Sequence, residues 1–211
     1  MGRCPSGHPL RTGWTIAVLC AVCIALFTGC AMRGPLNWVP NDEPRPYTYH
    51  LSKWSRTGVS YQDIQSQIFY RATLFSPAFA KVLSEEKAER MGLNSSEAAQ
   101  LLEESLKISR QELTIFVALV TKDPHWNDLG ERAPTLIAKL SSDDGLNADR
   151  PTSVQRLTEN EIADYRPFFP YADGLSTGYI LTFKMPKRLD TLRLSIGGPP
   201  GLAEVEWLIE P

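Results

Sequence analysis

The sequence YILTFKM at residues 179–185 alternates apolar and polar side chains along most of its length, and LRLSI (192–196) and VEWLI (205–209) do the same. Because successive side chains of a β-strand point to opposite faces, this period of two predicts half-buried antiparallel strands. Glycine and proline separate the last two stretches, in GGPPG at 197–201, and predict a turn. This spacing of strands and turns is typical of a β-sandwich or barrel.

Further strand patterns precede this region. The run LTIFVALV (113–120) is rich in apolar and β-branched residues and has the length of a strand. Weaker strand patterns cover 135–140 and 152–157, and the turn signal DDG lies at 143–145. Residues 112–211 are therefore predicted to form antiparallel β-structure.

A helical period is predicted before residue 112. Ser60 is a candidate N-cap, with Asp63 three residues later, and apolar side chains then recur in steps of three or four. They are Ile64, Ile68, Phe69, Ala72 and Phe75. We expect Phe69, Phe75 and Phe79 to lie in the core, and the alternative is an aromatic box that lines a ligand site.

Cap signals predict two more helices. Ser76-Pro77 combines an N-cap with proline at the first helical position, and Gly92 is a candidate C-cap. Asn94 with Glu97 predicts the start of the next helix. Residues 48–111 are therefore predicted to form a helical segment.

The predicted fold class is α+β. The N-terminal helical segment (48–111) is followed by an antiparallel β-sandwich (112–211) of immunoglobulin-like or transthyretin-like type. We expect residues 48–211 to form one structural domain. A fold of this class hosts many functions, so it does not choose one.

Residues 1–29 have the composition of a secretory signal. Arg3 and Arg11 precede the uncharged, mostly apolar run WTIAVLCAVCIALFT at 14–28. That run is shorter than the roughly 20 residues that a membrane-spanning helix needs. A cleaved signal peptide is therefore predicted, with an uncleaved anchor helix as the alternative.

The run LFTGC at residues 26–30 places two small residues directly before Cys30. It resembles the lipobox of bacterial lipoproteins, in which the cysteine becomes the new N-terminus. The resemblance implies diacylglycerol on the Cys30 sulfur, cleavage after Gly29 and acylation of the freed amine, which together anchor the protein in the membrane. Ala31, in place of an aspartate, implies the outer membrane, with the protein facing the periplasm.

Four prolines lie between the cysteine and the helical segment, at Pro35, Pro40, Pro44 and Pro46. Each proline removes a backbone donor and favours extended geometry in the residue before it. Residues 30–47 are therefore predicted to form a lipidated, stiff tether.

A polar loop is predicted after the strand at 113–120. Asp123, His125 and Asp128 bring two carboxylates and an imidazole to one connection. A hydrolase could use such a base, but no serine elbow or zinc motif accompanies it. We expect a solvated connection, and a lipid-anchored hydrolase that uses His125 is the alternative.

Hard oxygen ligands gather close to the DDG turn. They come from Asp143, Asp144, Asn147 and Asp149. The order of an EF-hand loop and its closing glutamate are missing, so a hairpin turn is expected. The alternative is a calcium-dependent adhesion module.

The run YRPFFPY at 165–171 carries four aromatic residues without a helical or strand period. One hypothesis is a partner-binding surface formed by an exposed loop. Its residues would be Tyr165, Arg166, Phe168, Phe169 and Tyr171. The other interpretation is a crossover in which Phe168 and Phe169 plug one end of the β-structure.

The remaining features argue against catalysis and nucleic-acid binding. The chain has 22 Lys and Arg against 24 Asp and Glu, so no basic excess favours a nucleic acid. The four cysteines all lie in residues 1–30, and no P-loop or dinucleotide motif is present, so no metal or other cofactor is expected.

The mixed charges of residues 85–90, Lys87 among them, are expected to form a solvated helix face. The sequence thus predicts a non-catalytic lipoprotein that binds or braces an envelope protein or polymer.

Overall fold

The computed structural model describes residues 46–62, 65–142, 148–186 and 190–209. The predicted signal peptide, Cys30 and residues 31–45 of the tether lie outside them. The helices of the described residues are α2 (Pro46–Trp54), α3 (Pro77–Met91), α4 (Ser95–Gln111) and α5 (Glu159–Tyr165), with a 3-10 turn at Pro124–Trp126.

The strands form two antiparallel sheets, so the α+β class is confirmed. One sheet has the order β1-β2-β3-β7-β6 and the other the order β5-β4-β8-β9. The strands of the first are β1 (Ser55–Gln62), β2 (Gln65–Leu74), β3 (Glu112–Thr121), β7 (Thr177–Lys184) and β6 (Ser153–Arg156). Those of the second are β5 (Ala148–Asp149), β4 (Ile137–Ser142), β8 (Thr191–Gly198) and β9 (Gly201–Leu208).

The period of two is confirmed in the strands that it predicted. On β9, Val205 and Trp207 are buried, whereas Glu206 and Leu208 are exposed. On β8, Leu192, Leu194 and Ile196 are fully buried. Each of these strands therefore has one face in the core.

The predicted helix after Ser60 is wrong. The chain there forms the hairpin β1-β2, and Asp63 and Ile64 lie outside the described residues. The buried side chains of β2 follow period two, with Ile68, Tyr70, Ala72 and Leu74 all inside. Because β2 pairs with β1 on one side and β3 on the other, ladder hydrogen bonds and burial outweigh the local helical spacing. The predicted helical segment 48–111 thus contains two strands of the larger sheet.

The predicted caps of the two long helices are confirmed. The Ser76 hydroxyl accepts a hydrogen bond from the Phe79 amide at 3.2 Å, and Gly92 ends α3 in the left-handed conformation, with φ of 63°. Asn94 and Glu97 form a reciprocal capping box at the start of α4. The α3–α4 hairpin is therefore defined locally by its sequence.

The two sheets meet across Tyr70 of β2. Its hydroxyl donates to the carbonyl oxygens of Leu194 and Ala203, at 3.1 and 3.2 Å, on the other sheet. Gly58, the β1 partner of Tyr70, leaves room for the ring, since a Cβ at Gly58 would lie 2.4 Å from it. A buried tyrosine with a satisfied hydroxyl therefore joins both sheets.

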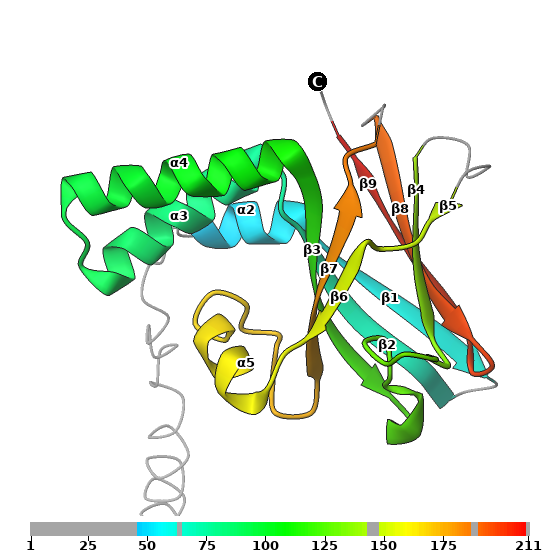
Figure 1. The fold of residues 1–211 in the computed structure, drawn as a ribbon. Helices are drawn as coiled ribbons and strands as arrows, with labels where there is room; N and C mark the ends of the chain where they lie inside the picture. Colours follow the sequence, from blue (N-terminus) through cyan, green and yellow to red (C-terminus); the bar gives the residue numbers. More distant parts are fainter. Residues whose placement is uncertain (1–45, 63–64, 143–147, 187–189, 210–211) are drawn as a thin grey trace, which may run out of the picture. The chain divides into compact units, whose positions relative to one another are not determined.

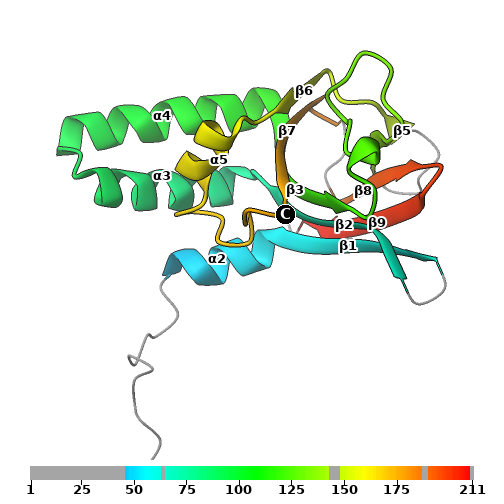
Figure 2. The ribbon, with the colours of Figure 1, turned by 90° about the horizontal axis from the view of Figure 1, so that it is seen from below.

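The helices gather at one end of the sheets, with α3 beside α4 in both views (Figures 1 and 2). Helix α2 starts at Pro46, so the last two residues assigned to the tether belong to the folded domain. Tyr47 is buried, and its hydroxyl donates to the Phe168 carbonyl oxygen at 2.7 Å. Among the residues that the structure describes, no helix combines the length and apolar character needed to cross a membrane.

Candidate functional site

The polar loop after β3 contains a carboxylate–imidazole pair on the surface. A carboxylate oxygen of Asp123 lies 2.9 Å from Nδ1 of His125, and it also accepts the His125 amide at 3.0 Å. The amide and ring of His125 lower the pKa of Asp123 below its usual value. The His125 side chain is 93% exposed, and in the described part of the chain no hydroxyl or thiol is hydrogen-bonded to its ring.

Asp128, the third residue of this loop, has a structural role. It is buried, and its carboxylate accepts the amides of Thr135 and Leu136 at 2.5 and 3.1 Å. Burial raises its pKa, but these hydrogen bonds outweigh burial and hold the pKa below its usual value. Asp128 therefore fastens the connection that leads into β4.

The candidate calcium ligands lie mostly outside the described residues. Asp143, Asp144 and Asn147 belong to this group, and Asp149 is exposed on β5. Within the described ranges, no three His, Cys, Asp or Glu side chains gather in a way that could hold a metal ion. The calcium module stays a hypothesis.

The aromatic run 165–171 packs into the domain, and its interpretation as an exposed partner surface is wrong for the phenylalanines. Phe169 is fully buried, and Phe168 is 9% exposed. The ring of Phe169 lies 4.6 Å from that of Phe116 and 5.8 Å from that of Phe75 between their centroids. Because both rings are buried at this end of the sheet, they are not accessible to a partner protein.

The other members of the run are held by neighbouring groups. Tyr165 stacks on Phe116 at 5.4 Å, and the Tyr171 hydroxyl is hydrogen-bonded to Thr73. Arg166 is exposed, but its Nε donates to the Ala172 carbonyl oxygen at 3.1 Å. The run is a plug between the larger sheet and helix α3.

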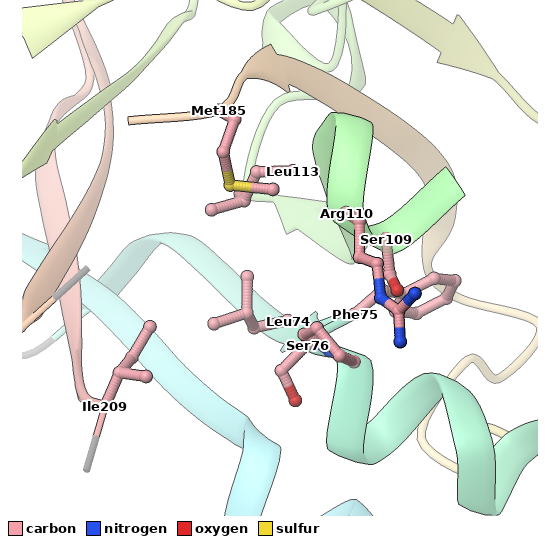
Figure 3. A pocket seen from close by; sticks show the side chains of 9 residues that line it. Leu74, Phe75, Ser76, Ser109, Arg110, Leu113, Met185 and Ile209 are labelled. Atoms are coloured by element: carbon pink, nitrogen blue, oxygen red, sulfur yellow. The ribbon is translucent and has the colours of Figure 1, made fainter. Parts of the chain in front are cut away.

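An apolar cavity of about 260 Å³ opens where β2, α4, β7 and β9 end (Figure 3). In Figure 3, Leu74 points toward Leu113 and Met185, and Arg110 lies on the far side of the cavity from Ile209. The lining residues are Leu74, Phe75, Ser76, Pro77, Ser109, Arg110, Leu113, Met185 and Ile209. An apolar wall with few polar groups is typical of a site for an apolar ligand.

A second cavity, of about 210 Å³, lies between the α3–α4 hairpin and the larger sheet. Helices α3 and α4 supply Ala80, Leu83, Ser84, Lys87, Ser105, Ile108 and Ser109, and the remaining wall comes from Phe75, Thr114, Tyr165 and Ile180. Phe75 and Ser109 line both cavities. The two cavities are therefore neighbours that share a wall.

Lys87 was expected on a solvated helix face, and that prediction is wrong. The side chain is half-buried in the wall of the second cavity, and burial lowers its pKa. Its ammonium lies 5.7 Å from the centre of the Phe168 ring. The neighbouring Glu86 pairs with Arg90 at 2.7 Å instead. Charge composition alone could not reveal this placement, because the covering ring comes from a segment far along the chain.

Phe75 was expected in the core, with a ligand-lining role as the alternative. The ring is partly buried and packs on Phe79 and Phe169, but it also forms the wall between the cavities. Phe75 therefore packs against the core and also lines both cavities. Phe69, by contrast, is 42% exposed on the outer face of β2.

Comparisons with known protein families, with curated proteins and with solved structures found no match for this chain.

Proposed function

We propose that this protein is a lipid-anchored lipoprotein of the bacterial cell envelope whose folded domain binds or braces another envelope component without catalysis. The observation that carries the binding role is the pair of neighbouring apolar cavities at the helical end of the sheets. Apolar clefts with a few polar groups are the usual form of a binding site. The proposed anchor rests on the run LFTGC, which follows an apolar segment and ends at Cys30.

The polar loop supports a hydrolase less well. The Asp123–His125 pair would supply a base, but a hydrolase also needs a nucleophile within hydrogen-bond reach of it. His125 projects into solvent, whereas covalent catalysis depends on a site that positions substrate and excludes water. Binding through the cavities therefore remains the favoured role.

The β-part is further proposed to be a sandwich of immunoglobulin-like or transthyretin-like type. The two antiparallel sheets joined through Tyr70 support this proposal. A rigid β-core suits such a role, because it holds the helical end and its cavities in one geometry.

Replacement of Cys30 by serine is expected to abolish lipid attachment. The serine hydroxyl cannot take the place of the thiol that accepts diacylglycerol, so unprocessed precursor or released protein should accumulate. Metabolic labelling with radioactive palmitate, followed by membrane fractionation, measures both effects.

The matched control for Cys30→Ser is Cys23→Ser, which changes a cysteine inside the apolar run. Cys23→Ser should keep the label and the membrane location. If wild-type protein takes up no label and Cys30→Ser fractionates as wild type does, the lipoprotein proposal fails.

A photo-crosslinking amino acid at position 108 is expected to capture the envelope component in living cells. Ile108 lines the second cavity and is half exposed, so a crosslinker there can reach a bound molecule. The control position is Tyr61 on β1, which is at least as exposed but lines neither cavity. Defined adducts at position 108 and none at position 61 are expected by gel shift and mass spectrometry. Equal adducts at both positions would contradict binding through the cavities.

A further inference from the structure

The geometry points to one ligand class for the two cavities: a single-chain amphiphile with an anionic head, its alkyl chain in the apolar trough and its head at Lys87. This inference deepens the proposed function and rests on it, because it names the envelope component that enters the cavities.

The two cavities are suited to an alkyl chain when they are taken together. Each of them, at about 260 and 210 Å³, is smaller than the roughly 300–1,000 Å³ typical of small-molecule sites. A ligand that occupies both cavities would have a volume in that range available to it, and the lining residues Phe75 and Ser109, common to both, show that the cavities are adjacent. An alkyl chain is assigned because a flexible chain can follow the bend past the Phe75 side chain, whereas a rigid ring system cannot. The side chains at the far end are apolar, with Leu113, Met185 and Ile209 among them.

Lys87 supplies the charge that selects the head group. Its ammonium is half-buried, and in the part of the chain that the structure describes it forms no ion pair with a carboxylate. Burial without a counter-ion costs free energy, which an anionic ligand would offset. The contact with the Phe168 ring offsets only part of this cost, because a ring face attracts a cation more weakly than a carboxylate does.

Two residues of the same cavity wall carry a hydroxyl group that has no hydrogen bond to another described residue. The hydroxyls of Tyr165 and Ser105 both belong to lining residues, and neither forms a hydrogen bond with another described residue. Ser84 and Ser109, by contrast, already donate to the carbonyl oxygens of Ala80 and Leu106. The ammonium of Lys87 is therefore the group in this wall to which the anionic head is assigned, since a charge-assisted hydrogen bond is stronger than a neutral one.

Arg110 marks the other end of the trough, but it is the weaker candidate for the head group. Its side chain lines the first cavity and is exposed to solvent. An exposed cation is screened by water and salt, whereas a half-buried one interacts more strongly. The head group is therefore assigned to Lys87 and the chain end to the first cavity.

The test is photoaffinity labelling of the full-length protein in isolated membranes. The first probe is a palmitic acid analogue with a diazirine near the chain end, and the second is the matching fatty alcohol. The acid is expected to label wild-type protein strongly, and the label should map to residues of the first cavity. The alcohol is expected to label it about tenfold less, which is the usual scale of one charge-assisted bond.

Lys87→Gln is expected to reduce labelling by the acid about tenfold while leaving the weak labelling by the alcohol unchanged. Unchanged alcohol labelling shows that the cavity is intact, so a folding defect is separated from a loss of charge. The matched control is Lys81→Gln, which removes an exposed lysine of the same helix that faces Glu85. Both probes should label the Lys81→Gln variant as strongly as they label the wild-type protein.

A third probe separates the two sources of an anionic head. A lysophosphatidic acid analogue with the same diazirine chain carries a phosphate in place of the carboxylate. Labelling by either anionic probe that exceeds labelling by the alcohol supports the inference. The anionic probe that labels the protein more strongly identifies the head group. Acid labelling of Lys87→Gln at the wild-type level would overturn it, and so would wild-type labelling by the alcohol as strong as that by the acids.

The outcome of this test is distinct from that of the proposed function. If no probe labels the protein and the crosslinker at Ile108 still captures a macromolecule, the amphiphile inference fails and the binding role stands. If the crosslinker at Ile108 captures nothing and the probes do not label the protein, both fail.

Discussion

Replacement of Trp207 by alanine is expected to leave the domain largely unfolded. The indole is fully buried on β9, and loss of such a side chain costs about 3–5 kcal/mol. Its Nε1 also donates to the Trp54 carbonyl oxygen at 2.8 Å, at the junction of α2 and β1. The substitution therefore removes packing and also the hydrogen bond that joins β9 to the end of α2. The free energy of unfolding of an ordinary domain is about 5–15 kcal/mol, so this loss removes most of the stability of a domain at the lower end of that range.

Denaturant titration followed by circular dichroism measures this effect. Trp207→Phe keeps an aromatic ring but removes the N–H donor, so it should cost less stability than Trp207→Ala. The difference between the two variants separates the contribution of packing from that of the hydrogen bond. The matched control on the same strand is Leu208→Ala. Leu208 is 70% exposed, and its loss should cost less than about 1 kcal/mol. Equal midpoints for Trp207→Ala and Leu208→Ala would contradict the register of β9.

Replacement of Phe169 by alanine is expected to cost about 3–5 kcal/mol as well. The ring is fully buried at the centre of an aromatic cluster. Five aromatic rings have centroids 4.6 to 6.3 Å from its own, those of Phe75, Phe79, Phe116, Tyr165 and Tyr171. Because aromatic pairs contribute beyond the area that they bury, the loss should exceed that of an aliphatic side chain of similar size.

The control for Phe169→Ala is Phe69→Ala, which removes the same side chain from an exposed position on β2. It should cost about 1 kcal/mol or less. Thermal and denaturant melts of the two variants give the comparison. A cost for Phe169→Ala no larger than that for Phe69→Ala would mean that the run 165–171 is not a plug, and the hypothesis of an exposed partner surface would return.

The second cavity, which belongs to the proposed binding site, depends on this plug for its shape. Phe169 packs on Phe75 and Tyr165, which line the second cavity. If a Phe169→Ala variant still folds, the cavity wall should relax into the vacated space. Labelling by the fatty acid probe should then fall even though Lys87 is intact.

Local signals in the sequence predicted the elements whose structure is set by near neighbours. The caps at Ser76, Gly92 and Asn94 are hydrogen bonds over a few residues, so the residue types alone defined α3 and α4. A capping box at Thr158 and Glu161 starts α5 in the same way, and this signal in the sequence was missed. The alternation on β8 and β9 likewise depends on one buried face per strand.

The sequence by itself therefore determined the α+β class, the long helical hairpin and the face of each C-terminal strand. Only the tertiary structure decided that residues 55–74 form β1 and β2, because the partner strand β3 lies about fifty residues further along the chain. Tertiary structure also decided that Phe168 covers Lys87 and that Phe75 divides two cavities. These features are set by contacts between segments that are distant in the sequence. The physical reason is that burial and strand pairing depend on residues anywhere in the folded chain, whereas helix and strand propensities depend on a few neighbouring residues.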